Sequence, residues 1–294
     1  MELYVYFNGS FIKASEAVIS IYDHGFLYGD GLFETMRVYE GITFKFDEHM
    51  DRFYAGAQAL RIEVPLVRSV IKKAVNVLIE KNNLADAVAR VMITRGEGGI
   101  GIDINLCPQP TILITVSPLL PVDERIYREG VKTCIVSRMR TPTQVIDASV
   151  KSNNYLSNIL ARADAREKGY YDGIMLSVEG YVAECTTSNI FVIQNDEVAT
   201  PALATGILRG ITRGVVIDIA AAYGITVEEK FMFPQDLCES SECFMTNSVS
   251  EIVPVVACDG APVGSGKVGL ITLNFVKEFR RVVNEYVRFH SHGE

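Results

Sequence analysis

The stretch ATGILRGITR, residues 204–213, carries the most informative local pattern in the chain. It places glycines and a hydroxyl residue at the start of an amphipathic helix that we expect over residues 208–223. The free N–H groups and the dipole at a helix start favour an anion, so the stretch predicts an anion-binding turn. An ordinary glycine-rich turn with a helix cap explains the same residues equally well.

Two ionisable residues that precede this stretch have apolar neighbours. Lys151 follows the segment VIDASV, residues 145–150, and precedes a helix expected over residues 154–168. A lysine at the mouth of a site forms a Schiff base when burial lowers its pKa, although most lysines are simply solvated. Glu184 ends a strand expected over residues 181–184, where it is either a buried acid that needs a partner or an edge-strand acid in water.

A second glycine-rich segment, RGEGGIG at residues 95–101, follows a strand expected over residues 87–94. Backbone N–H groups in such a segment can hold a phosphate. This one lacks the GK[ST] ending of a P-loop and does not open a helix, as a dinucleotide-binding motif would. We therefore interpret it as a flexible loop near a site.

The other segments alternate between hairpins and amphipathic helices. Turns are expected at Asn8-Gly9 and at residues 39–41. A helix capped by Asp47 places Arg52 on its polar, solvent-facing side. The apolar residues of that helix share the opposite face: Met50, Phe53, Tyr54, Ala57 and Leu60. Further strands are expected over residues 111–116, 131–136, 173–178 and 189–193, and further helices over 66–83 and 267–289.

The segment SPLLPVD, residues 117–123, contains two prolines that interrupt this alternation. We place an interdomain linker at residues 118–124, between an N-terminal domain of residues 1–117 and a C-terminal domain of residues 125–294. Because the strands occur in mixed hairpins rather than regular strand–helix–strand repeats, a doubly wound parallel sheet is disfavoured. The sequence predicts an α+β fold.

Composition excludes several classes of function. The 294 residues include 28 Lys and Arg against 36 Asp and Glu, a net charge of −8, which disfavours a nucleic-acid partner. No apolar run is long enough for a membrane span and the chain does not start with a signal peptide, so we expect a cytoplasmic protein. The six cysteines have no CxxC spacing and the four histidines no HExxH spacing, so we expect no metal.

Seven motifs in order along nearly the whole chain together resemble the fold-type IV pyridoxal-phosphate enzymes. This family comprises branched-chain aminotransferases, D-amino acid aminotransferases and aminodeoxychorismate lyases. The motifs are YDHGFLYGDGLFE (22–34), EHMDRF (48–53), TRG (94–96), KSNNYL (151–156), VAE with SNIF (182–191), LRGITR (208–213) and TNSVSEI (246–252). The resemblance implies a smaller N-terminal α/β domain and a larger, β-barrel-like C-terminal domain with helices, which binds the cofactor.

The resemblance implies pyridoxal 5′-phosphate as the cofactor. Lys151 resembles the lysine that forms the internal aldimine and then moves a proton between the substrate α-carbon and C4′. Glu184 resembles the carboxylate that keeps the pyridine nitrogen protonated, which makes the ring a better electron sink. The other cofactor-binding residues that it implies are Arg52, Ile211, Thr212 and Ser248 around the phosphate, Tyr155 beside O3′, and Leu208 against the ring.

Residues around the substrate resemble those of the branched-chain enzymes. Arg90 matches the arginine that they use for the side-chain carboxylate of glutamate, and Tyr28 and Phe33 would line the apolar pocket. Two departures stand out. Val88 replaces a tyrosine that contacts the α-carboxylate, and residues 247–249 replace a Gly-Thr-Ala turn, with Ser248 and Val249 as the substrate contacts there.

The other members of the family match less well. The D-amino acid enzymes carry an arginine and a histidine shortly after TRG, whereas residues 97–103 contain no basic residue. In the lyases the next arginine would fall at Ile100, and the catalytic threonine would fall at Glu34, beside Thr35.

The resemblance therefore predicts a transaminase that moves the amino group of a branched-chain or other apolar L-amino acid to 2-oxoglutarate. The alternatives are an aminodeoxychorismate lyase, a D-amino acid or amine transaminase, and a ligand-binding protein without turnover, against which Lys151 and Glu184 argue. The expected partners are amino acid and 2-oxo acid substrates and a second copy in a homodimer that shares Tyr28 across its interface. Arg52 and Arg90 precede the linker and Lys151 follows it, so we expect the site in an interdomain cleft.

Overall fold

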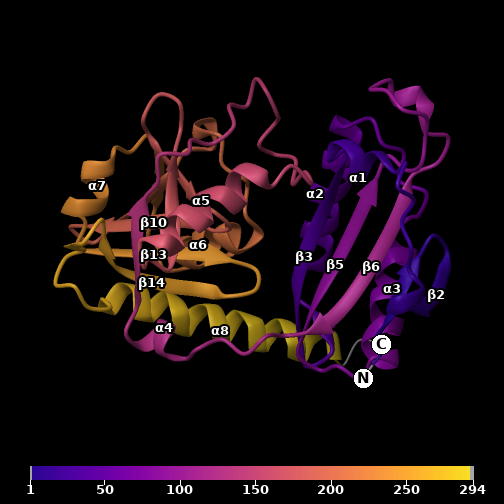
Figure 1. The fold of residues 1–294 in the computed structure, drawn as a ribbon. Coiled ribbons are helices and arrows are strands. Elements are labelled where there is room, and N and C mark those ends of the chain that lie inside the picture. Colours follow the sequence, from indigo (N-terminus) through magenta and orange to yellow (C-terminus); the bar gives the residue numbers. More distant parts are fainter. Residues whose placement is uncertain (1, 292–294) are drawn as a thin grey trace. The chain divides into compact units, whose positions relative to one another are not determined.

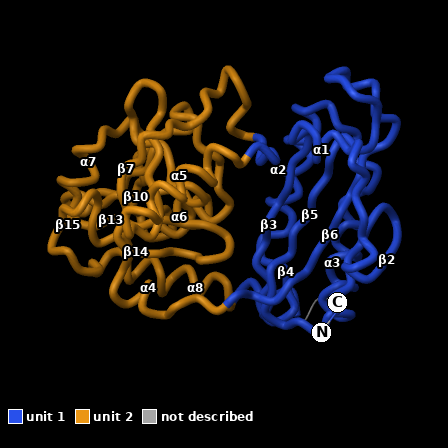
Figure 2. Tube along the Cα trace, viewed as in Figure 1, with its two compact units in different colours: residues 1–120, 150–154, 285–294 blue, residues 121–149, 155–284 orange. Residues whose placement is uncertain are grey.

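A computed structural model describes residues 2–291, which form two compact units (Figure 2). Of the described residues, unit 1 comprises 2–120, 150–154 and 285–291, and unit 2 comprises 121–149 and 155–284. The chain passes from unit 1 to unit 2 between Leu120 and Pro121 and later returns twice to unit 1. The first return, residues 150–154, contains Lys151.

Unit 1 is built on an antiparallel sheet with the strand order β2-β1-β6-β5-β3-β4. Helices α2 and α3 pack against one face and form its hydrophobic core with β3, β5 and β6 (Figure 1). The elements are β1 (Tyr4–Phe7), β2 (Ser10–Lys13), α1 (His24–Tyr28), β3 (Gly31–Tyr39), β4 (Ile42–Thr43), α2 (Phe46–Ala59), α3 (Arg68–Lys81), β5 (Ala87–Thr94) and β6 (Thr111–Pro118).

The two faces of this sheet differ in character. In β3, Leu32, Met36 and Val38 are buried in the core beneath the helices. Because side chains alternate along a strand, Glu34 shares the helix side and Phe33 lies on the opposite face. Thr35 pairs with Arg90 of β5, so Arg90 shares that opposite face with Phe33. One strand thus supplies polar residues to both sides of the sheet.

Unit 2 contains a nine-stranded mixed sheet with the order β12-β11-β10-β13-β14-β7-β8-β9, and β15 pairs with β14. The sheet curls so that its end strand β9 lies beside β10, and the amide of Cys185 at the end of β9 donates to the Ser188 carbonyl just before β10. The elements are α4 (Arg125–Arg128), β7 (Val131–Ile135), α5 (Leu156–Glu167), β8 (Asp172–Leu176), β9 (Val182–Cys185), β10 (Asn189–Gln194), β11 (Glu197–Pro201), α6 (Ile211–Ala222), β12 (Val227–Lys230), α7 (Pro234–Glu239), β13 (Glu242–Asn247), β14 (Glu251–Cys258), β15 (Ala261–Pro262) and α8 (Leu270–Ser291).

The α+β class is confirmed, and so are the expected hairpins at Asn8-Gly9 and residues 39–41. One cap is wrong. The second helix begins at Phe46 after Lys45, and Asp47 lies in its first turn, where an acid still interacts favourably with the helix dipole. Strands β11, β13 and β14 were not predicted, because most of their residues are buried and lack the alternation of a half-exposed strand. Strand β12, in which no residue is buried, was also missed. Within residues 2–291, no helix is both long and apolar enough to span a membrane.

Candidate active site

Backbone hydrogen bonds hold Lys151 beside the first residues of β3. The amide of Phe33 donates to the Lys151 carbonyl at 3.0 Å, and the amide of Asn153 donates to the Gly31 carbonyl at 2.9 Å. Gly31 leaves room for this approach, since a Cβ there would lie 2.6 Å from Nδ2 of Asn153. The lysine segment therefore belongs structurally to β3, although more than one hundred residues of sequence separate them.

Three predicted site residues come together at this edge. The Nζ atom of Lys151 lies 4.7 Å from the centre of the Phe33 ring, and the guanidinium carbon of Arg90 lies 3.9 Å from it. Both distances are typical of cation–π contacts. An amine, an aromatic wall and a guanidinium are thus grouped within unit 1.

Arg52 occupies an environment that its helical position did not indicate. It is not solvent-facing: only 11% of its side chain is exposed, and its Nε and Nη2 atoms donate to Glu34 at 2.6 and 2.8 Å. Oε2 of Glu34 also lies 2.7 Å from Nδ1 of His49, one turn earlier on α2. Glu34 and His49 were absent from the predicted site. The sequence pattern that could have indicated them is an acid within an apolar strand, together with a histidine and an arginine three residues apart on one helix.

Burial and pairing act in opposite directions on this cluster. Burial by itself raises the pKa of Glu34, but Arg52 and the His49 hydrogen bond outweigh it and lower the pKa to about 2. For His49, burial dominates and lowers the pKa below its ordinary value of 6.5. A carboxylate only accepts hydrogen bonds, so Nδ1 of the neutral ring carries the proton and donates it to Glu34.

Glu184 of unit 2 is a second buried carboxylate, which excludes the edge-strand alternative. Its Oε1 atom lies 3.0 Å from Nη2 of Arg140, and Oε2 accepts from the side-chain amide of Asn189 at 3.0 Å and the amide of Leu208 at 3.2 Å. The expectation that a buried acid needs partners is confirmed. Arg140 and Asn189 are further polar residues that sequence reasoning missed.

The glycine-rich turn is built around the same carboxylate. Asn189 also donates to the Leu208 carbonyl, and a Cβ at Gly210 would lie 2.0 Å from its Oδ1 atom, so only glycine fits there. The helix begins at Ile211 with Gly210 as its N-cap, a few residues later than expected, and no side chain caps it. This leaves backbone donors at the start of a twelve-residue helix, next to the buried Thr212.

The remaining predicted residues occupy turns and helix ends. Tyr155 is the N-cap residue of α5. Ser248 and Val249 lie in the turn between β13 and β14, where Oδ1 of Asn247 accepts from the amides of Val249 and Ser250. Tyr28 ends α1, and its hydroxyl accepts from the amide of Gly101.

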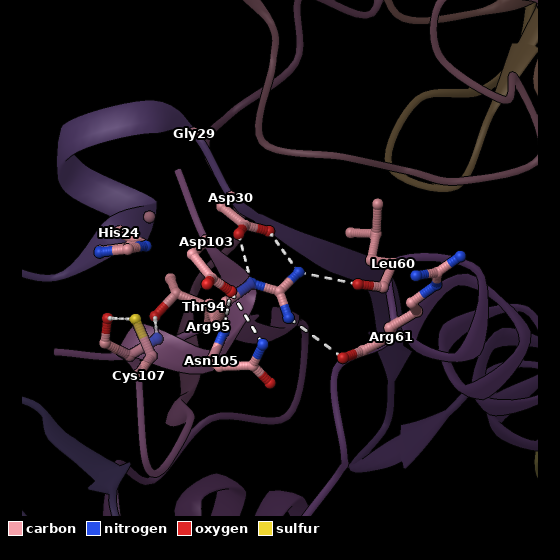
Figure 3. Close-up of polar contacts among 12 residues, drawn as sticks. His24, Gly29, Asp30, Leu60, Arg61, Thr94, Arg95, Asp103, Asn105 and Cys107 are labelled. Atoms are coloured by element: carbon pink, nitrogen blue, oxygen red, sulfur yellow. Dashed lines mark hydrogen bonds and ion pairs between the residues drawn. The ribbon is translucent and has the colours of Figure 1, made fainter. Parts of the chain in front are cut away.

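The TRG motif has a structural role (Figure 3). The guanidinium of Arg95 forms an ion pair with Asp30 and donates to the carbonyls of Leu60 and Arg61, at the end of α2. Thr94 donates to Asp23. The motif thus fastens the helix to the start of β3.

The glycine-rich loop that follows is also held in place. Nε2 of His24 lies 2.9 Å from the Gly99 carbonyl, and the amide of Gly98 donates to the Tyr22 carbonyl. Gly96 has a φ of 98°, and a Cβ there would lie 1.9 Å from the Gln109 carbonyl oxygen. These contacts tether the loop to α1 and the segment before it, which differs from the flexible loop that we expected.

Each of the two units thus carries its own set of residues that are suited to binding or catalysis. Unit 1 holds Glu34, His49, Arg52, Phe33, Arg90 and Lys151, and unit 2 holds Glu184, Arg140, Leu208, Ile211, Thr212 and Ser248. The amine in unit 1 can react with a carbonyl compound. The helix start in unit 2, with its adjoining hydroxyls, can bind an anionic group. Among residues 2–291, no three His, Cys, Asp or Glu side chains are arranged to hold a metal ion.

Comparison with known proteins identifies the family. A family model described as amino-transferase class IV matches residues 31–258. A putative branched-chain-amino-acid aminotransferase of Methanocaldococcus jannaschii is 38% identical over 95% of this chain and 96% of its own length. The aminodeoxychorismate lyase of Bacillus subtilis is 33% identical over 96% of each chain.

Solved structures agree. The T.th. branched-chain amino acid aminotransferase in complex with N-(5′-phosphopyridoxyl)-L-glutamate has a TM-score of 0.91 and 27% identity, over 96% of this chain and 94% of that one. The same enzyme with pyridoxamine 5′-phosphate has a TM-score of 0.92. These comparisons define the class of the protein, an aminotransferase that uses pyridoxal 5′-phosphate. The chain belongs to the class IV aminotransferases, the fold-type IV family, and is similar to its branched-chain members.

The residues present fit this cofactor. Glu184 is a carboxylate held in place by a guanidinium and two amides, which suits a protonated ring nitrogen. The uncapped start of α6 and the hydroxyl of Thr212 suit a phosphate. Lys151 supplies a primary amine for an aldehyde.

The pKa of Glu34 predicts acid-dependent stability. Its folded pKa, about 2, lies below the ordinary 4.5, so the stabilisation is complete above about pH 4.5 and is lost as pH falls toward 2. The shift corresponds to about 3 kcal/mol. Urea unfolding should therefore show that the wild type loses more free energy of unfolding over this interval than Glu34→Gln. The exposed substitution Glu63→Gln is the control, and parallel curves for wild type and Glu34→Gln would contradict the assignment.

Proposed function

We propose that this aminotransferase moves the amino group of a branched-chain or other apolar L-amino acid to 2-oxoglutarate. The observation that carries the proposal is the group formed by Phe33, Arg90 and Lys151. The Phe33 ring offers an apolar wall for the amino donor. The Arg90 guanidinium offers a fork for the second carboxylate of 2-oxoglutarate or glutamate. The T.th. relative was solved with a phosphopyridoxyl derivative of L-glutamate, which supports this acceptor.

The proposal assigns a role to each predicted residue. Lys151 is the catalytic lysine. The cofactor is held by Arg52, Tyr155, Glu184, Leu208, Ile211, Thr212 and Ser248. The substrate is contacted by Tyr28, Phe33, Arg90, Ser248 and Val249. The family resemblance and the local geometry of each unit support these assignments.

The bound cofactor supplies an electron sink for the electron pair left at the substrate α-carbon. Nζ of Lys151 accepts the proton from that carbon and delivers it to C4′ as a general base and acid. Glu184 holds a proton at the ring nitrogen. Arg140 and the two amide donors stabilise the ionised form of Glu184, which is the form that can do so. Tyr155 would bind the cofactor at O3′, as the family resemblance implies.

One observation keeps the aminodeoxychorismate lyase as a second candidate. The position that matches the lyases' catalytic threonine is Glu34, which is ion-paired beneath the helices and cannot take that role. The adjacent Thr35, however, pairs directly with Arg90 across the sheet and shares its face. A hydroxyl therefore lies on the side of the sheet that carries Phe33 and Arg90, and the Bacillus subtilis relative bears the lyase name.

The assay that tests the function measures the products of both reactions. Purified protein given L-leucine and 2-oxoglutarate should form glutamate, and Lys151→Ala should lower the rate by about 10²- to 10⁴-fold or more. Lys72→Ala, an exposed lysine on α3, should keep the wild-type rate. No glutamate from L-leucine or other apolar L-amino acids, together with pyruvate release from aminodeoxychorismate, would establish the lyase instead. Parallel reactions with the D-enantiomers test the D-amino acid alternative.

A second prediction concerns Arg90, whose substitution should affect the reaction with 2-oxoglutarate more than the reaction with L-leucine. Because Arg90 is assigned to the acceptor's second carboxylate, Arg90→Met should lower kcat/KM for 2-oxoglutarate by roughly ten- to a hundredfold. The half-reaction with L-leucine has no second carboxylate and should change by less than about threefold. Stopped-flow half-reactions measure each separately. Equal losses for the two substrates would remove Arg90 from this role.

We further propose that the enzyme is a cytoplasmic homodimer. The described cysteines are all free thiols, which is usual in a reducing compartment. Two segments of unit 1 expose large apolar side chains, which we propose form one apolar patch: Val18, Ile21, Phe26, Ile100 and Ile102. Two hydrogen bonds join the segments that carry these residues: the amide of Gly98 donates to the Tyr22 carbonyl, and the amide of Gly101 donates to the Tyr28 hydroxyl. An open pocket of about 310 Å³ beside the patch is lined by Ile19, Ile21, Phe26 and Met92, among others. Exposed apolar surface of this kind marks interfaces.

A charge in the patch should dissociate the dimer. Phe26 is 73% exposed in the isolated chain, so Phe26→Glu should fold normally and raise the dimer dissociation constant at least about tenfold. Sedimentation equilibrium measures the constant. Val67→Glu, an exposed apolar residue at the start of α3, is the control. If Phe26→Glu stays as dimeric as wild type, the interface lies elsewhere.

A further inference from the structure

The cluster of Glu34, His49 and Arg52 poses a physical problem. Glu34 is 1% exposed and lies between Leu32 and Met36, both fully buried, on the apolar side of β3. Burying an ion pair carries a desolvation cost that its attraction often fails to repay, and apolar residues at such positions are often equally stabilising. An acid in this core therefore points to a role beyond holding unit 1 together.

The geometry of the cluster indicates what that role is. Glu34 accepts from two of the three guanidinium nitrogens of Arg52, with Nε on Oε1 and Nη2 on Oε2. A guanidinium is planar, so two parallel bonds to one carboxylate fix the plane and direction of the whole group. The direction of the third nitrogen, Nη1, is thereby set as well.

His49 completes the arrangement from the other side. Its Nδ1 atom donates to Oε2 of Glu34 at 2.7 Å, so the carboxylate is held by α2 at two points. The ring is 2% exposed, and Arg52 and Lys151 both disfavour a charge on it, against the attraction of Glu34. A neutral His49 can hold the carboxylate without competing with Arg52 for its charge.

We propose that Glu34 and His49 are positioning residues that aim the Nη1 atom of Arg52 at the phosphate of the cofactor. This inference rests on the proposed function, which assigns Arg52 to that phosphate. Because Glu34 offsets the charge of Arg52, the contribution of Arg52 to phosphate binding depends on direction more than on net charge. A lysine at position 52 keeps the charge but cannot form the parallel pair of bonds.

The experiment compares two forms of the cofactor. Apoprotein is titrated with pyridoxal 5′-phosphate and with pyridoxal, which lacks the phosphate, and binding is followed by the absorbance of the cofactor. For Glu34→Gln we expect an affinity for pyridoxal 5′-phosphate roughly ten- to a hundredfold weaker, the range for a charge-assisted hydrogen bond. The affinity for pyridoxal should change by less than about threefold.

Two further variants complete the set. Arg52→Lys should show the same loss, confined to the phosphorylated form, and adding Glu34→Gln to it should cost little more. His49→Leu removes the second support of the carboxylate and should show a smaller loss of the same kind. Asp51→Asn, next to Arg52 on α2, is the matched control, since it breaks an exposed ion pair with Arg68 of α3 and should alter neither titration. Thermal unfolding verifies that each variant is folded.

The outcomes separate the inference from the proposed function. If Arg52→Lys loses the preference for the phosphorylated form and Glu34→Gln and His49→Leu keep it, the positioning role is overturned and the assignment of Arg52 stands. If Glu34→Gln weakens both forms equally, its role is structural only. If Arg52→Lys binds both forms as wild type does, the assignment of Arg52 fails and the inference fails with it. Should Glu34→Gln not fold, His49→Leu decides by the same comparison.

Discussion

The hydrogen bond from the Phe33 amide to the Lys151 carbonyl joins the chemistry of unit 1 to its scaffold. Lys151 belongs to a five-residue segment that returns to unit 1 from the middle of the chain. The 3.0 Å bond, together with that from Asn153 to Gly31, makes the segment part of the β3 edge. The Lys151 amine is consequently held at a fixed place relative to Phe33 and, through the β3–β5 ladder, to Arg90.

Strand β3 also separates its buried carboxylate, Glu34, from the residues on the opposite face of the sheet. Its alternation sends Glu34 toward α2 and sends Phe33 and Thr35 to the opposite face, so one strand supports two different environments. In unit 2, Glu184 follows the same electrostatic logic as Glu34. Each buried carboxylate is bound by one arginine and at least one N–H donor that carries no full charge, which compensates its desolvation. The difference lies in position: Glu34 faces a helix within a core, and Glu184 faces the turn that opens α6.

The sequence predicted most of the helices and the hairpins of unit 1 because these elements are amphipathic or have glycine turns. It missed β13 and β14, whose largely buried residues give no alternation. It also predicted Arg52 on a solvent-facing side, because helical spacing shows which residues share a face but not what covers that face.

Glu34 and Arg52 lie eighteen positions apart on a strand and a helix, and nothing local links them. The ligands of Glu184 were missed for the same reason. Arg140 and Asn189 reach it from separate segments, and only the fold brings them together.

One of the two departures from the branched-chain pattern, Val88, lies on the face of the unit 1 sheet that carries Arg90. Val88 and Arg90 are two residues apart on β5, and their partners on β3 are Arg37 and Thr35. A valine in place of a tyrosine removes a hydroxyl from this face, and the hydroxyl of Thr35 lies on the same face directly opposite Arg90. A site that hydrogen-bonds its substrate discriminates between substrates far more strongly than an apolar site. The polar residues left on this face therefore affect which substrates are rejected more than how tightly apolar side chains are held. The register of β3 against β5 thus governs both the grouping of Arg90 with Phe33 and the selectivity of the proposed reaction.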